Sequence, residues 1–333
     1  MPHHHPIVTD RKVAALRQAM GPVIAGALAD RLVVEVMVNP DGKIWIDRIG
    51  EGRKATDSII SSNDANTILR LLADHAGVIV NADTPLVSAT LPETGERFQG
   101  IFPPIVARPS FAIRKRPSAV FPLSHYVESK IMHASIAEAL RQALRDRLNI
   151  IVIGGTGSGK TTLTNALLAE PAIINDRVVI IEDTAELQCV AHDCISMLTK
   201  AIAPVVTMGD LARATLRLRP DRIIVGEVRD GSILEMIKLW NTGHPGGIAT
   251  LHANSPMEAL YRVEDLVGEV TERIPFRQIA MTINLIVEIR RAPGSPAGRV
   301  VDRLVYVNGH EDSEYVLSEL RAANAANVER KIA

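Results

Sequence analysis

Cysteine is nearly absent from this sequence of 333 residues, which contains only Cys189 and Cys194. The two residues are not in C-x-x-C spacing and have no second pair nearby. A four-cysteine zinc site is therefore excluded, and a reduced cytosolic setting is the simpler interpretation. Aromatic residues make up only 3% of the chain. This leaves few side chains for the stacking platforms that bind single-stranded nucleic acid.

The sequence also lacks long apolar runs and an excess of charge of either sign. No run of about eighteen apolar residues occurs and the N-terminus has no apolar signal core, so we predict no transmembrane insertion and no cleaved signal. The formal net charge of -1 argues against a large basic surface, and nucleic acid is not expected as a direct ligand. A composition of 47% hydrophobic and 23% charged residues is typical of a globular protein, and the length allows two domains.

The strongest motif is a glycine-rich loop between an apolar strand and a helix-forming run, and it satisfies G-x-x-x-x-G-K-[ST] at every fixed position. In such a loop several backbone N–H groups point at one anion, and the helix adds its positive N-terminal end. Lys160 then reaches the β- and γ-phosphates of a nucleotide, and Thr161 offers a hydroxyl to Mg²⁺. The predicted phosphate-binding residues are Gly155, Thr156, Gly157, Ser158, Gly159, Lys160, Thr161 and Thr162.

Residues 1–117 are predicted to form an α+β domain, followed by a proline-containing linker over 118–134. Helical periodicity predicts helices over 13–29 and 64–75. Short apolar segments between turn residues predict strands over 33–38, 43–47, 86–91, 97–102 and 110–116. The three histidines at 3–5 indicate a disordered tail rather than a metal site.

Residues 135–333 show a different pattern, in which helices alternate with strands that are apolar throughout. Such strands are typical of a parallel sheet buried between helices, and ligands bind such sheets at the carboxyl ends of the strands. The predicted strands are 148–153, 177–182, 222–225, 247–252, 285–289 and 300–307. The predicted helices are 136–147, 160–169, 208–218, 232–240, 256–270 and 276–283, with a frayed helix beyond Leu320.

Carboxylates follow two of these apolar strands. Glu227 comes after the strand 222–225, where P-loop hydrolases place an acid that holds the water shell of the metal or polarises the attacking water. No aspartate precedes it, so Glu227 is both the catalytic candidate and the only acid on hand for Mg²⁺. The alternative is that Glu227 caps the next helix. Glu182 and Asp183 leave another buried strand, where charge is costly unless it faces a metal or a cation, and Arg229 is a candidate partner for either.

Four segments, in this order along the chain, resemble the Walker A, Asp box, Walker B and His box motifs of the secretion or traffic ATPases. They lie at 154–162, 181–187, 218–230 and 242–254. With the short N-terminal module, the resemblance extends to nearly the whole chain. Within that family, the sequence most resembles the conjugal transfer ATPases of the TrbB type, which power type IV secretion and mating-pilus systems. The lack of a tetracysteine insertion argues against the type II secretion branch, and the retraction motors of type IV pili are the closest competitor.

The resemblance implies a RecA-like C-terminal domain, a homo-hexameric ring, and ATP with Mg²⁺ between the two domains. It implies catalytic roles for Lys160 and Glu227, a supporting role for Glu182 in the metal and water network, and a γ-phosphate sensor in His252. Arginines of the N-terminal domain would neutralise phosphate charge on closure. The candidates are Arg97, Arg114 and Arg116. Which of them does so is left open, because alternate side chains of a strand face opposite ways.

The resemblance further implies a cytoplasmic protein, peripheral at the inner membrane, whose partners are inner-membrane components of a type IV secretion system. The residues alone leave two other classes of protein possible. A P-loop kinase acting on a small molecule would leave the histidine-flanked strand 247–252 and the N-terminal module without a role. A nucleic-acid translocase would be stimulated by DNA, against which the low aromatic content and near-neutral charge argue.

Overall fold

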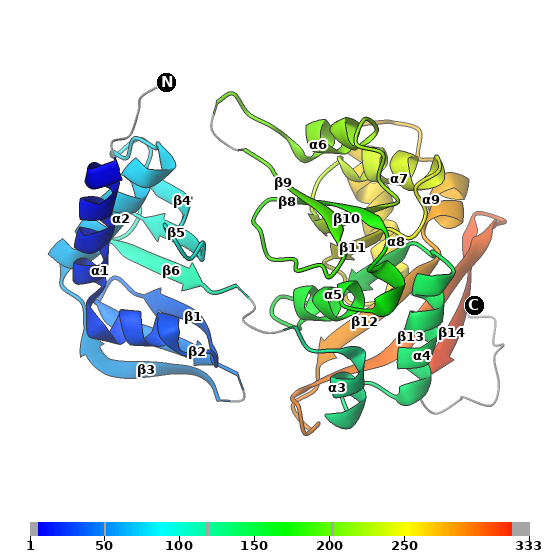
Figure 1. Cartoon of the computed structure of the whole chain (residues 1–333), viewed down its shortest axis with the longest axis horizontal. Coiled ribbons are helices and arrows are strands. Elements are labelled where there is room, and N and C mark those ends of the chain that lie inside the picture. Colours follow the sequence, from blue (N-terminus) through cyan, green and yellow to red (C-terminus); the bar gives the residue numbers. More distant parts are fainter. Residues whose placement is uncertain (1–5, 50, 117–119, 201–202, 322–333) are drawn as a thin grey trace. The chain divides into compact units, whose positions relative to one another are not determined.

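The computed structural model describes residues 6–49, 51–116, 120–200 and 203–321 (Figure 1). The chain divides into two compact units, Met1–Ser118 and Ala119–Ala333. The first is an α+β unit and the second a larger α/β unit, which confirms the predicted fold class. Among the described residues, none of the helices has both the length and the apolar character needed to cross a membrane.

The first unit is a six-stranded antiparallel sheet of order β3-β2-β1-β6-β5-β4 that packs on two helices. Its elements are α1 (Pro6–Ala29), β1 (Val33–Val38), β2 (Lys43–Arg48), β3 (Gly52–Ile59), α2 (Ser62–Ala76), β4 (Leu86–Thr90), β5 (Arg97–Ile101) and β6 (Ser110–Arg114). Helix α1 is kinked at Gly21, where the backbone is not helical. Strand β3 was not predicted, because this edge strand is polar and mostly exposed.

The second unit is an eight-stranded sheet of order β14-β13-β12-β7-β11-β10-β8-β9. The strands from β12 to β9 run parallel, whereas β13 and β14 pair antiparallel at one edge. Its strands are β7 (Ile150–Ile153), β8 (Arg177–Glu182), β9 (Asp193–Leu198), β10 (Arg222–Val228), β11 (Ile248–Leu251), β12 (Leu285–Arg291), β13 (Arg299–Glu311) and β14 (Glu314–Arg321). Its helices are α3 (Leu123–Glu128), α4 (Ala134–Arg145), α5 (Lys160–Leu168), α6 (Met208–Thr215), α7 (Ile233–Asn241), α8 (Pro256–Gly268) and α9 (Phe276–Thr282), with a 3₁₀ turn at Pro171–Ile173.

The central parallel strands are largely apolar because each of them contributes to two cores, whereas the parallel edge strand β9 is mostly exposed. Ile150 and Val152 of β7 pack into the core that contains α4 and α5. Ile151 and Ile153 of the same strand pack into the core that contains α7, α8 and α9. Side chains that alternate along a strand therefore both enter apolar layers, which leaves only the strand ends for polar groups.

Three segments differ from the sequence-based prediction. Strands β9 and β14 were missed, because edge strands carry more polar and exposed residues than central ones. The predicted linker 118–134 contains α3, whose Leu123 and Tyr126 are buried in the core of the second unit. The predicted frayed helix beyond Leu320 and the histidines at 3–5 fall outside the described residues, except that Arg321 ends β14.

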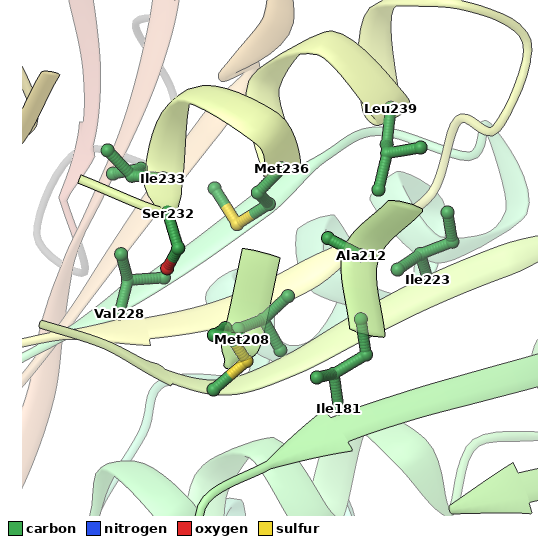
Figure 2. Close-up of a pocket in the computed structure, with 10 residues that line it drawn as sticks. Ile181, Met208, Ala212, Ile223, Val228, Ser232, Ile233, Met236 and Leu239 are labelled. Carbon is green, nitrogen blue, oxygen red and sulfur yellow. The ribbon is translucent and has the colours of Figure 1, made fainter. Parts of the chain in front are cut away.

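A cavity of ≈ 10 Å³ lies behind the parallel sheet, between β8, β10, α6 and α7 (Figure 2). Ser232 is the one polar residue in its lining, and the other lining residues, such as Met208 and Met236, are apolar. A water molecule needs about this volume and two or more polar partners. This cavity is therefore a small gap in the packing and not a ligand site.

Candidate active site

The glycine-rich loop leaves the carboxyl end of β7 and leads into α5, as predicted. Gly154, Gly157 and Gly159 have φ values of 152°, 68° and 111°, in the region that favours glycine. A Cβ on Gly154 would also lie within 3.0 Å of the carbonyl oxygen of Ile289 in β12. The backbone of the loop can therefore follow this path only because side chains are absent at these positions.

Lys160 is the first residue of α5 and is only 7% exposed. Its Nζ donates to the carbonyl oxygens of Gly154 (2.9 Å) and Gly155 (3.3 Å). It also lies 3.2 Å from Nδ1 of His252, which follows β11. The structure thus brings together two of the predicted site residues that are 92 positions apart.

The remaining loop residues line the same turn with different exposure. Gly155 and Thr156 are exposed at its tip, and Thr162 is half-buried in the first turn of α5. Ser158 is 2% exposed, and its Oγ has no hydrogen-bond partner among the described residues. A buried hydroxyl without a partner, next to glycines in left-handed conformations and a buried ammonium, fits a loop that binds the phosphates of a nucleotide.

Thr161 connects the loop to the Asp box segment. Its Oγ1 donates to Oε2 of Glu186 at 3.4 Å, and Asn165, one turn further along α5, donates to the carbonyl oxygen of Glu186 at 3.2 Å. Glu186 was not predicted as a site residue. The signal was available, because Glu186 lies in the Asp box segment four positions after Glu182.

Glu182 ends β8 and is 3% exposed. Its Oε1 accepts hydrogen bonds from the backbone N–H groups of Glu186 (3.0 Å) and Leu187 (2.9 Å), so this carboxylate fixes the turn that presents Glu186 to Thr161. On the neighbouring strand β10, a Cβ on Gly226 would lie 2.8 Å from Cγ of Glu182. Glycine at this position therefore makes room for the Glu182 side chain.

Glu227 lies near the end of β10, where the pairing with β11 shifts register between Val225 and Val228. Such an irregularity changes the direction of the side chains that follow it. Oε1 of Glu227 is 2.7 Å from Nε2 of His252, and Oε2 accepts a hydrogen bond from Nη2 of Arg229. The helix-capping alternative is wrong, because α7 begins only at Ile233 with Ser232 as its N-cap residue.

Burial and the neighbouring charges together set the pKa of His252. Burial lowers the pKa of the imidazole from its ordinary value of 6.5, and Lys160 and Arg229 lower it further, while Glu227 acts in the opposite direction. His252 is therefore neutral at pH 7. Glu182 and Asp183 were the two expected partners of Arg229, and its Nη1 lies 4.0 Å from Oδ2 of Asp183. Its shorter ion pair, with Glu227, was not predicted.

The three candidate arginines of the first unit lie together at one end of β5 and β6. Arg97 and Arg114 are directly opposite each other in the antiparallel pairing, so their side chains share a face. The guanidinium of Arg116 lies against Gly95, just before β5. Lys115 faces the other way, and its Nζ donates to the carbonyl oxygen of Asp30 at 2.6 Å. Which of the three arginines reaches the phosphates stays a prediction.

Direct metal ligands are scarce in the part of the chain that the structure describes. No group of three histidine, cysteine, aspartate or glutamate side chains there is arranged to hold a metal ion. In P-loop sites in general, a hydroxyl, waters and the phosphates themselves supply most of the Mg²⁺ ligands.

A mainly parallel sheet, a phosphate loop after β7 and a carboxylate at the end of β10, two strands away, define this protein as a P-loop ATPase. The family model described as "Type II/IV secretion system protein" matches residues 18–304, and the chain belongs to that family.

Relatives within the family narrow the assignment. The chain is 43% identical to conjugal transfer protein TrbB of Rhizobium radiobacter over 307 residues, which cover 92% of this chain and 93% of the relative. It is 31% identical to type IV secretion system protein VirB11 of Bartonella quintana, over 86% of this chain and 92% of the relative. The predicted family, conjugal transfer ATPases of the TrbB type, is confirmed.

Solved structures agree in fold. The X-ray structure of the Legionella pneumophila ATPase DotB matches with a TM-score of 0.60 and 21% identity, covering 92% of this chain and 82% of that chain. The pilus retraction motor PilT with bound ADP matches with a TM-score of 0.59 and 20% identity, covering 84% of this chain and 80% of that chain. At these identities, the two structures show only that the fold is shared.

Proposed function

We propose that this protein is a hexameric ATPase that hydrolyses ATP to power substrate transfer or pilus assembly by a conjugative type IV secretion system. The observation that carries the proposal is the convergence of Lys160, His252 and Glu227 at the carboxyl ends of β7, β11 and β10. The relatives named conjugal transfer protein and type IV secretion system protein support the biological setting.

The loop and Lys160 bind the phosphates of ATP. Nζ of Lys160, which now donates to the carbonyl oxygens of Gly154 and Gly155, exchanges these neutral acceptors for phosphate oxygens. Thr161 and, through water, Glu227 would hold Mg²⁺, which neutralises phosphate charge when bound. Glu182 keeps the Asp box turn in place, so that Glu186 and Thr161 stay in contact.

Glu227 positions and polarises the attacking water. Arg229 and His252 contact its two carboxylate oxygens and fix their orientation. Nε2 of a neutral His252 lies 2.7 Å from Oε1 of Glu227, and Nζ of Lys160 lies 3.2 and 3.3 Å from the two ring nitrogens, so one imidazole lies between the phosphate-binding group and the catalytic acid. When Lys160 moves toward the γ-phosphate, its contact with His252 changes, and with it the contact between His252 and Glu227. In this way His252 senses the phosphate.

Arg97, Arg114 or Arg116 of the first unit completes the site on closure, because phosphoryl transfer depends on positioning and on neutralising charge. Closure then couples hydrolysis to movement of the two units in a homo-hexameric ring. We place the ring in the cytoplasm at the inner membrane, bound to inner-membrane components of the secretion system. A pilus retraction motor is the alternative, because it would share the four motifs and differ in its partner and not in its chemistry.

Phosphate release from purified protein, measured across a concentration series with sizing of the same samples, tests this proposal. We expect turnover per subunit to rise as a hexamer forms. Glu227→Gln should bind ATP but hydrolyse it about 10³-fold more slowly, because the general base and water-positioning group is lost.

Glu235→Gln in α7 is the matched control, since that carboxylate pairs with Lys238 on the helix surface at 2.9 Å. It should hydrolyse ATP like the wild type. An equally active monomer would contradict the shared ring, and an active Glu227→Gln variant would contradict the catalytic assignment.

A further inference from the structure

Two arginines of the β12–β13 hairpin lie against the phosphate loop. Arg291 ends β12 and Arg299 begins β13, and the two are directly opposite each other in the antiparallel pairing. Their side chains therefore leave the same face of the hairpin. Nη2 of Arg291 lies 2.5 Å from where a Cβ on Gly157 would be, and Nη1 of Arg299 lies 2.8 Å from the corresponding position at Gly159.

The neighbouring arginines of the same hairpin are all neutralised. Arg290 pairs with Asp302 at 2.5 Å. Arg303 pairs with Glu288 and Glu319 at 3.4 and 2.8 Å. Within the described ranges, Arg291 and Arg299 make no ion pair with a carboxylate. Two guanidinium groups without a counter-charge thus lie beside a loop whose N–H groups already favour an anion.

The hairpin is held firmly against the loop. The carbonyl oxygen of Ile289, two residues before Arg291, occupies the space beside Gly154, and the Ile289 side chain reaches to 3.2 Å from the Cβ position of Gly159. β12 also pairs directly with β7, the strand that leads into the loop. The backbone positions from which the two arginines extend are therefore set by the same packing that shapes the loop.

We propose that Arg291 and Arg299 are nucleotide-binding residues that hold the polyphosphate from the hairpin side of the loop. The proposal rests on the proposed ATPase function and deepens it. Both groups belong to the same unit as the loop and therefore need no closure to bind the phosphates. The proposal assigns them to binding of the ground state, where they hold the polyphosphate equally before and during the reaction. Their loss should therefore raise KM and the dissociation constant while kcat changes little, unlike the loss of Glu227.

Binding of ATP with Mg²⁺ to the full-length chain, measured by calorimetry for the wild type, Arg291→Gln, Arg299→Gln and the double variant, tests this assignment. We expect each single change to weaken binding about tenfold and the double change about a hundredfold, which is typical of charge-assisted hydrogen bonds to phosphate. Inorganic tripolyphosphate, used as a competitor, should lose affinity by the same factors. The salt dependence of binding should also become shallower in the double variant.

Three further variants separate the effect of charge from the effect of structure. Arg290→Gln removes an arginine of the same hairpin that already pairs with Asp302, and it should bind ATP like the wild type. Arg291→Lys and Arg299→Lys keep the charge and should retain most of the affinity. Thermal unfolding identifies any variant that does not fold, and the lysine variants then carry the test.

The outcomes distinguish this assignment from the function on which it rests. A wild-type chain that binds no ATP overturns both. A wild-type chain that binds ATP, with a double variant of equal affinity, overturns only the role of the two arginines. Unchanged affinity for tripolyphosphate in variants that bind ATP weakly also overturns it, because the arginines would then contact the base or the ribose and not the phosphates.

Discussion

The two sheets of this protein carry their charged residues in different places. In the first unit, a row of charged residues crosses the sheet from β5 to β3. Each residue of this row lies directly opposite the next one on the neighbouring strand. Its members are Arg97, Arg114, Glu35, Asp47 and Arg53. In the second unit, strands β7, β8, β10 and β11 keep their middle parts apolar, and Glu182 and Glu227 stand at the ends.

The difference follows from how many faces of each sheet are covered. Core residues such as Val36, Phe98 and Ile113 lie on one face of the first sheet only, so the opposite face accepts charge anywhere along a strand. The parallel strands of the second unit have apolar layers on both faces. In β7, β8, β10 and β11 charged groups are confined to the strand ends, so residues distant in sequence converge at one edge. Glu288 in the middle of β12 is paired with Arg303.

The largest expected effect is on the free energy of unfolding, and it tests whether only one face of the first sheet is buried. Ile113 and Arg114 are neighbours in β6, and Ile113 is 0% exposed. Ile113→Ala should lower the free energy of unfolding by about 2–5 kcal/mol, because it leaves a cavity in the core. Arg114→Ala, on the opposite face, should lower it by less than about 1 kcal/mol. Urea unfolding of both variants measures the difference, and equal losses would show that both faces are buried.

The next effect concerns the backbone of the phosphate loop. Gly154→Ala should weaken ATP binding about a hundredfold, because the added Cβ meets the carbonyl oxygen of Ile289 and the backbone conformation strains any other residue. Gly155→Ala is the matched control, since a Cβ there meets nothing within 4 Å. Calorimetric titration with ATP compares the two. Similar affinities would contradict the packing of the loop on β12.

A smaller effect, on kcat, is expected where the end of β10 approaches the end of β8. Gly226→Ala should reduce kcat about tenfold with little change in ATP affinity, because its Cβ displaces the Glu182 side chain and with it the Asp box turn. Gly209→Ala in α6 adds the same group where the nearest atom is 3.5 Å away. This control should leave kcat unchanged and stabilise the helix by about 0.5–1 kcal/mol. Steady-state phosphate release decides the outcome.

The smallest expected effect concerns Glu35 in the charged row. Burial raises the pKa of this carboxyl above its ordinary value of 4.5, with Arg114 opposing and Asp47 reinforcing the change. The folded chain therefore holds the proton to higher pH than the unfolded chain. Ionisation of Glu35 lowers stability as the pH rises through the folded-state pKa, whereas below pH 4.5 this loss is absent.

Glu35→Gln should consequently stabilise the protein at pH 7 by less than about 1 kcal/mol, because the side chain is only half-buried and water screens the charge. It should leave stability at pH 4 unchanged. Melting temperatures of the variant and the wild type across this pH range measure the effect. A loss of stability at pH 7 would show that the attraction of Arg114 outweighs burial.

Several parts of this structure could be predicted from local sequence. The phosphate loop was predicted in full, because its glycines and Lys160 are consecutive and each has a fixed chemical role. The hairpin of β1 and β2 was predicted from two apolar runs around a proline and glycine turn. Strands β3 and β9 were missed, because their residues bury too little surface to leave an apolar pattern. Strand β14 was also missed, although its Tyr315 and Leu317 are buried.

The composition and motifs of this chain determined that it has a P-loop, a buried parallel sheet and acids at two strand ends, since these features follow from neighbouring residues and their periodicity. Only the tertiary structure decided which side chains meet. It placed His252 between Lys160 and Glu227, and Glu186 beside Thr161. It also brought the β12–β13 hairpin to the loop. These contacts depend on strand order, and strand order is set by the packing of two apolar layers along the whole unit, which no local pattern contains.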